Sequence, residues 1–260
     1  MSSLWIFLVA LGAGAFGSML GLGGGIILVP ALTLLFNVPI KQAVGASLVG
    51  VVATSCAGVQ GYLRAGLVDW QIAVRLLIPT VLGAIVGGLL VGIIPPKMVA
   101  GLFILLVLYV LGQMLWAGRH ATPAETASDT CYATWGNARQ KGLAAALSAM
   151  GGVISALLGV GGGLIQVPVL HTLLHAPLRC AIGTSSFLIG TTASTSALLY
   201  FVQGKLQPDI VVPAALGVLI GAKLGMRLAH RTPAGVLRGI FMMVMIYTII
   251  RIYIKWFAGG

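Results

Sequence analysis

The stretch Gly21-Leu-Gly-Gly-Gly-Ile-Ile-Leu-Val-Pro30 returns later in the chain as Gly159-Val-Gly-Gly-Gly-Leu-Ile-Gln-Val-Pro168. The offset is 138 residues. It holds without a gap between 20–66 and 158–204, where 17 of 47 positions are identical. Chance agreement in glycine-rich apolar sequence would give a few identities, not a gapless series of matched glycines and prolines. The sequence therefore predicts two copies of one unit, each containing a glycine run.

The glycine runs lie in an unusually apolar chain. Of its 260 residues, 59% are hydrophobic and 7% are charged, and the mean hydropathy is +1.08. Soluble domains carry about 25% charged residues, so most of this exterior must face lipid. We expect an all-α polytopic membrane protein with about 8–10 membrane segments. The apolar stretches lie at 4–20, 24–36, 43–63, 70–92, 97–117, 142–158, 162–175, 180–202, 208–230 and 234–257.

A polar stretch divides these segments into two sets. It covers 118–140 and holds two of the four acidic residues, Glu125 and Asp129. We therefore predict a membrane repeat at 1–117, a polar linker at 118–140 and a second membrane repeat at 141–260. Within each repeat, the stretch after the glycines (24–36 or 162–175) is too short to cross a hydrocarbon core of about 30 Å comfortably as a helix. We predict a broken or re-entrant element at both places.

The relative orientation of the copies depends on how often each crosses the membrane. Four crossings per copy make them parallel and distribute Lys and Arg evenly between the two sides. An odd number makes them inverted and gathers most basic residues on one side, which favours the inverted model with both termini outside. In that model one side holds Arg64, Arg119, Arg139, Lys141, Arg179, Lys223, Arg227 and Arg231, and the other holds Lys41, Lys97, Lys205, Arg251 and Lys255.

The net charge of +11 is consistent with residues that set topology and meet anionic lipid, because the basic residues lie mainly at the ends of apolar segments. We expect no nucleic-acid partner and no cofactor. The three cysteines, Cys56, Cys131 and Cys180, are odd in number and widely spaced, so no disulfide framework or metal motif is predicted. The N-terminus lacks a basic signal region, and we interpret it as retained.

The glycine runs are the first candidates for a solute site. Irregular backbone at membrane depth is tolerated only where protein or a water-filled cavity covers it, and the helix that follows would direct bare N–H groups into that cavity. Two such turns, one per repeat, are typical of a central site in a transporter. The alternative is close helix packing through small residues. The candidate residues are Gly23, Gly24, Gly25, Gly161, Gly162 and Gly163.

Hydroxyl side chains cluster in the segment after each glycine element. Hydroxyls can donate to an oxyanion without adding a fixed charge, which suits an anion that must also leave. Ser47 and Thr54, like Ser185 and Thr192, are seven apart and share a helix face. The alternative is that these hydroxyls bond to their own helix. The candidate substrate-binding residues here are Ser47, Thr54, Gln166, Thr184, Ser185, Ser186 and Thr192.

Charged and imidazole side chains give weaker signals. Lys223 begins a stripe with Arg227 and Arg231; it could attract a substrate, although snorkelling to the interface is the simpler interpretation. His171 and His175 have a spacing able to hold a metal ion, but no Cys, Asp or Glu is near in sequence to complete a site. No carboxylate lies inside a predicted span. Asp69 and Asp209 stand near the starts of corresponding spans, where N-capping explains them.

The duplicated G-x-GGG-x-x-x-VP element, followed by P-(I/L)-(K/R)-x-A-(V/I)-G-(A/T)-S, resembles the TauE/SafE (sulfite exporter) family of membrane transport proteins. The likeness extends to Leu82-Gly83…Gly87 and Leu216-Gly217…Gly221 and covers nearly the whole chain. It implies a carrier in a bacterial-type plasma (inner) membrane that exports sulfite, sulfonates or related sulfur anions. Lys223 departs from the neutral polar residue expected at its position.

These observations predict a secondary transporter that is not an enzyme, with a small anionic substrate bound near the midplane and exchanged by alternating access. A homo-oligomer is compatible with the sequence. Two alternatives remain: a transporter of another small solute or a metal cation, and a membrane-embedded enzyme. The first would need acidic or thiol ligands within the spans, and the second would need a nucleophile with a base or a metal constellation.

Overall fold

The computed structural model describes residues 3–19, 24–119, 131, 137–229 and 234–254. Every regular element in these ranges is helical, and no strand occurs in them. The elements are α1 (Ser3–Met19), α2 (Gly25–Leu35), α3 (Ile40–Arg64), α4 (Trp70–Ile93), α5 (Pro96–Arg119), α6 (Ala138–Leu158), α7 (Gly163–Pro168), the π-helical turn η1 (Val169–Leu173), α8 (Leu178–Val202), α9 (Pro208–Ala229) and α10 (Ala234–Tyr253).

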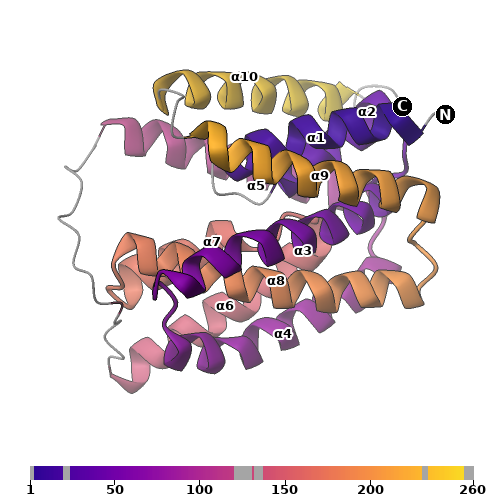
Figure 1. Ribbon diagram of the computed structural model, residues 1–260. Helices are drawn as coiled ribbons and strands as arrows, with labels where there is room; N and C mark the ends of the chain where they lie inside the picture. The colour runs from indigo at the N-terminus through magenta and orange to yellow at the C-terminus, as the bar shows by residue number, and fades with distance from the viewer. Residues whose placement is uncertain (1–2, 20–23, 120–130, 132–136, 230–233, 255–260) are drawn as a thin grey trace.

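The helices lie roughly along one direction, with α3 and α8 between an upper and a lower group (Figure 1). In the described ranges, six are long and apolar enough to cross a membrane: α3, α4, α5, α6, α8 and α9. Large apolar side chains on their outer faces are exposed, among them Ile78 at 65% and Leu105 at 67%. Such a surface requires lipid around it. The prediction of an all-α polytopic membrane protein is confirmed.

The two glycine elements form helical hairpins. In the second half, Gly162 lies against Gly151 and Ser155 of α6, while Gln166 is bonded to Ser148. Residue numbers therefore rise along α7 as they fall along α6, so α7 returns beside the helix that precedes it. The 11 residues of α2 span only about 16 Å. Both short elements turn back beside the helix that precedes them, as expected of broken or re-entrant elements.

The 138-residue offset also relates the observed elements. Helix α3 and helix α8 each have 25 residues, and their bounds differ by this offset at both ends. Left-handed backbone recurs with the same spacing at Gly24 and Gly162, at Gly66 and Gly204, and at Asn37 and His175. One difference appears after the matched prolines, where α2 continues as α-helix but the second hairpin changes to the π-helical turn η1.

Helices α3 and α8, which the offset equates, pack against each other in antiparallel fashion. Gly45 lies against Tyr200, whereas Gly183, further toward the start of α8, lies against Tyr62 near the end of α3. Corresponding helices of parallel copies would point the same way. The antiparallel pair is the arrangement expected of inverted copies, and α1 begins at the same end of the molecule at which α10 ends (Figure 1).

The two halves of the sequence interleave in space. Helix α9 of the second half packs most extensively on α1 of the first, and α4 of the first packs on α6 of the second. Glycines allow this approach: a Cβ on Gly221 would overlap the carbonyl oxygen of Leu11, and one on Gly83 would overlap that of Ala149. Close backbone contact through small residues is the usual means of association in lipid. The matched glycines of α4 and α9 thus have a packing function.

One expectation about cysteines is wrong. The sequence suggested no disulfide, but Cys131 and Cys180 are paired, with their Cα atoms 5.5 Å apart. The bond joins the polar linker to the first turn of α8 across 49 residues of sequence. A partner this distant cannot be identified from spacing alone. Glu125 and Asp129 of the linker, and Arg231 of the basic stripe, lie outside the described residues.

The sides of the membrane can be tested through this cysteine pair. It lies at the end where α3 finishes and α6 begins, beside the predicted basic group that includes Arg64 and Arg139. The positive-inside rule places this end in the cytoplasm, where thiols are kept reduced. In that compartment we expect the Cys131–Cys180 bond to be reduced, so that both thiols react with N-ethylmaleimide in intact cells, and we expect a C-terminal alkaline phosphatase fusion to be active. A pair found oxidised after rapid quenching, with an inactive fusion, would reverse the orientation.

Candidate functional site

The tips of the two hairpins meet at mid-height in the molecule. A Cβ on Gly25, at the first tip, would overlap the carbonyl oxygen of Gly159 at the second. Gly161 lies against Val51 and Ile189, which are near the midpoints of α3 and α8. The two breaks in helical structure therefore face each other far from either end of the central helices.

Both turns adopt left-handed backbone at the residue that precedes the returning helix. Gly24 has φ of 75° and Gly162 has φ of 71°, and each is the N-cap residue of its helix. Glycine adopts this conformation without strain. It has no side chain to accept from the first amides of the helix. The third amide, of Ile27 or Ile165, bonds to the carbonyl of the N-cap glycine, at 3.2 and 3.1 Å, whereas the first two have no partner within the helix itself. The first two amides after each turn are therefore the candidate donors of the site; Gly23 lies outside the described residues.

Ser47 holds the two tips together. Its Oγ lies 2.7 Å from the carbonyl oxygen of Gly159 and 3.3 Å from that of Gly25, so its single proton is directed to the first or shared between them. The side chain is fully buried. The predicted residues Gly25, Ser47, Gly161, Gly162 and Gly163 are brought together in this region, and Gly163 packs against Ile189.

The other predicted hydroxyls mostly bond to their own helix. Thr54 and Thr192 donate to carbonyls three or four residues earlier, at 2.9 and 2.8 Å, and Ser185 and Ser186 both donate to Ile182. Thr184 lies toward the end of α8, where its Oγ1 accepts from the amide of Asp69 at 3.0 Å. In this conformation Thr54, Thr192, Ser185 and Ser186 bond to their own helix, which is the alternative that the sequence analysis left open for these hydroxyls.

A hydroxyl that the sequence analysis did not single out lies at the second tip. Ser155 of α6 is completely buried, its Cβ lies next to Gly162, and its Oγ has no hydrogen-bond partner among the described residues. Buried polar atoms are almost always paired, so an unpaired one indicates a water, an ion or a ligand. The sequence held one signal for Ser155: the aligned position in the first copy is Gly17, so the two copies differ at the tip by a hydroxyl side chain.

The second hairpin also carries a buried polar cluster that the first hairpin lacks. Gln166 accepts from Ser148 of α6 at 3.2 Å and donates to Thr80 of α4 at 3.2 Å, and all three side chains are buried. The 138-residue offset replaces this polar triad with a wholly apolar set, also buried, of Leu28, Ala10 and Val218. Gln166 was predicted to bind substrate; the structure places it between the second hairpin and α4.

The predicted lysine does not join the tips. Lys223 is exposed on α9, on the side away from the glycines that pack on α1. A different lysine is held more tightly: Lys205, between α8 and α9, donates to Gln203 and lies 6.0 Å from the ring centre of Tyr200. Burial lowers the pKa of Lys205, and the nearby charge of Lys41 lowers this pKa further.

Comparison with known proteins identifies the family. The profile described as Sulfite exporter TauE/SafE matches residues 6–252, which is nearly the whole chain. The chain belongs to the TauE/SafE family.

Three relatives resemble this chain over most of its length. The probable membrane transporter protein YunE of Bacillus subtilis is 28% identical over 237 residues, covering 85% of this chain and 87% of its own. A probable membrane transporter of Haemophilus influenzae is 28% identical over 276 residues, covering 97% and 98%. One from Xylella fastidiosa is 31% identical over 245 residues, covering 92% and 89%. No solved structure matches the chain significantly.

Membership of the TauE/SafE family makes this chain a membrane transporter, and the glycine elements that carry the resemblance are the ones that form the hairpin tips. A large cavity lies elsewhere: it is apolar and lies between α5, α6 and the α7–η1 segment. None of the predicted site residues lines it. Within the described residues, no group of three or more His, Cys, Asp or Glu is placed to hold a metal ion.

The polar triad can be tested by giving the second half the residues of the first. Gln166→Leu alone leaves the buried hydroxyl of Ser148 without its partner, so we expect a loss of about 1 kcal/mol in stability. The triple change Gln166→Leu, Ser148→Ala, Thr80→Val removes every partner and should recover most of that loss. Thermal unfolding in detergent measures both. A single variant as stable as the parent would show that the triad contributes nothing.

Proposed function

We propose that this chain is a secondary transporter of a small oxyanion, with sulfite or an organosulfonate as the leading substrate class, and that the anion binds where the two hairpin tips meet. The observation that carries the proposal is the unpaired hydroxyl of Ser155 beside the bare amides that follow Gly162. The description of the family, Sulfite exporter, supports the substrate class. Export across a bacterial-type inner membrane is part of the same proposal.

The chemistry at the tips suits a small anion that must also be released. Backbone amides at a helix start donate hydrogen bonds and carry a partial positive charge. A serine hydroxyl adds a neutral donor. A fixed charge in the same place would hold the anion too tightly for turnover. Donors of this kind replace a hydration shell while leaving the site neutral when it is empty.

Positive charge outside the site would raise the local concentration of the anion. The chain carries 15 Lys and Arg against four acids. Lys41 and Lys205 are close enough at one end of the molecule for one to lower the pKa of the other. Two neighbouring ammonium groups attract an anion from solution, and the attraction of Lys205 weakens as the pH rises through its lowered pKa. This pair would serve as an approach region rather than the binding site.

Alternating access would come from movement of a hairpin against the central helices. Inverted copies with broken helices at the midplane are typical of carriers that rock one part against another. In the second half, the contacts that would break are the polar triad with α4 and the bond from Ser47 to Gly159. These are a small number of neutral hydrogen bonds, each with a modest net free energy.

Replacement of Ser155 separates function from stability. Removal of a buried hydroxyl that has no partner should leave the stability unchanged or slightly raised, because its desolvation is not compensated. We expect Ser155→Ala to reduce sulfite and taurine uptake into proteoliposomes about tenfold, which is the effect of one lost hydrogen bond to a charged group. Sulfate and Ni²⁺ serve as test solutes for the other substrate classes.

The matched control is Ser196→Ala, because Ser196 is the other buried hydroxyl without a partner in the described residues and lies on α8 outside the turns. It should transport normally. Equal activity of both variants would place the anion elsewhere. Uptake of Ni²⁺ in preference to any oxyanion would contradict the proposed substrate class.

A pair of glycine substitutions tests the turn itself. Gly162→Ala and Gly204→Ala both place a side chain on left-handed backbone, with φ of 71° and 66°, and this strain should cost each roughly 1–2 kcal/mol of stability. Gly162→Ala should cost more, because its Cβ would lie 3.1 Å from the carbonyl oxygen of Gly151 and 3.2 Å from the Cβ of Ser155. Only Gly162 lies at a tip; Gly204 has open space around it. At a temperature at which both variants remain folded, we expect transport to be lost in Gly162→Ala alone. Comparable transport by the two variants would argue against the turn as the site.

A further inference from the structure

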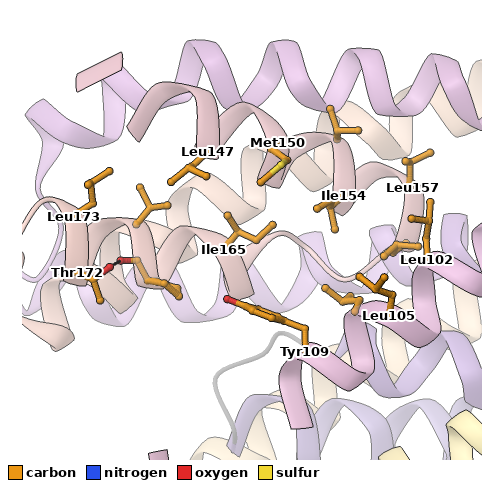
Figure 2. Close-up of a pocket in the computed structure, with 15 residues that line it drawn as sticks. Leu102, Leu105, Tyr109, Leu147, Met150, Ile154, Leu157, Ile165, Thr172 and Leu173 are labelled. Atoms are coloured by element: carbon orange, nitrogen blue, oxygen red, sulfur yellow. Dashed lines mark hydrogen bonds between the residues drawn. The ribbon is translucent and has the colours of Figure 1, made fainter. Parts of the chain in front are cut away.

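An apolar groove of about 630 Å³ runs between α5, α6 and the α7–η1 segment. Leu102 and Leu157 lie at one end and Leu147 and Leu173 at the other (Figure 2). Along α6 the lined part extends from Leu147 to Leu158, or about 16 Å. Its lining is apolar apart from the hydroxyl groups of Tyr109 and Thr172. The volume lies within the range of small-molecule sites.

The groove exists because the two halves differ at this place. Helix α10 is the counterpart of α5, and it packs against α2 in the first hairpin. Within the described residues, α5 makes no comparable contact with α7, and the groove lies between them. The π-helical turn η1, where the first half has regular α-helix, forms part of the wall. The second half therefore has a space where the first has helix–helix contact.

The surroundings of the groove are hydrocarbon. Both α5 and α6 are long and apolar enough to span a membrane. At the margins of the groove, Leu105 is 67% exposed and Met150 is 48% exposed, so the opening faces outward from the helices. An apolar space does not hold ordered water, because a bound water needs two or more polar partners. An acyl chain matches both the lining and the medium.

One end of the groove is basic. Arg139 in the first turn of α6 precedes Leu157 by 18 residues, which is five helical turns, so the two share the face that lines the groove. Arg139 is exposed and lies about 12 Å along the helix from Leu147, beyond the apolar lining. A guanidinium at that level is placed to meet a lipid phosphate. The hydroxyl groups of Tyr109 and Thr172 are the polar groups of the lining itself.

We propose that this groove is a binding site for an anionic phospholipid, with an acyl chain between α5 and α7 and the phosphate at Arg139. The proposal does not depend on the transported solute. It concerns a resident lipid that fills the space beside the second hairpin, and it predicts a composition in the purified protein that differs from the surrounding membrane.

The test measures lipids that remain with the full-length protein after purification in a mild detergent. We expect phosphatidylglycerol to be enriched over phosphatidylethanolamine relative to the source membrane, as quantified by mass spectrometry. Arg139→Gln should reduce this enrichment about fivefold, the effect of one cation near a lipid surface. Ile154→Trp fills the groove and should remove the retained lipid. The matched controls are Arg251→Gln on α10 and Val86→Trp on the exposed face of α4.

Three outcomes would overturn the proposal. Lipid in the purified protein could mirror the membrane composition. Ile154→Trp, folded by its unfolding temperature, could retain as much phosphatidylglycerol as Val86→Trp. The variant could also lower the oligomeric state measured by light scattering without altering retained lipid, which would assign the groove to a contact between copies. Enrichment lost in Arg139→Gln and Ile154→Trp, and kept in both controls, supports the site.

Discussion

The structure depends on one constraint: backbone amides that leave a helix inside a membrane must be covered by protein or face a polar solute. Two glycine turns, at Gly24 and Gly162, place such backbone in the interior of the folded molecule, near the midpoints of the central helices. Neither turn could exist at a lipid-facing surface. Each is enclosed by the other turn and by the central helices α3 and α8, and Ser47 bonds to the carbonyl at the far tip. The long central helices and their tight packing follow from the need to cover these turns.

Interleaving of the halves provides this cover. Helix α9 packs along α1, the first helix of the first hairpin, and α4 packs along α6, the first helix of the second hairpin. Both contacts use glycines that admit a neighbouring carbonyl oxygen, such as Gly221 against Leu11 and Gly83 against Ala149. Each hairpin is therefore held by a helix from the other half.

The sequence predicted features that recur with the repeat, but not contacts that bring distant residues together. Periodic apolar runs located the helices, and the paired glycines located both breaks, because three consecutive glycines interrupt a helix that the flanking apolar residues would otherwise continue. The N-cap of α4 at Asp69 was also foreseen, and its carboxylate accepts from Gln71 and Ile72. The Cys131–Cys180 pair, the polar triad and the unpaired Ser155 were not. Each depends on which faces of non-adjacent helices meet, and a single sequence contains no record of those contacts.

The differences between the copies are more informative about mechanism than their likeness. A carrier built from two equivalent hairpins would have the same free energy whichever hairpin had moved. Here the second hairpin has an unpaired hydroxyl at its tip, a side-chain contact with α4 and a π-helical turn, while the matching positions of the first hairpin are Gly17, Leu28, Ala10 and Val218. The hydroxyl at the first tip, Ser18, is paired: it donates to the carbonyls of Ala15 and Ala222. Apolar packing between helices gains little over lipid contact, whereas a neutral hydrogen bond in hydrocarbon has a defined geometry. If the second hairpin moves as proposed above, the partners of Gln166 and Ser155 are therefore the ones that would change.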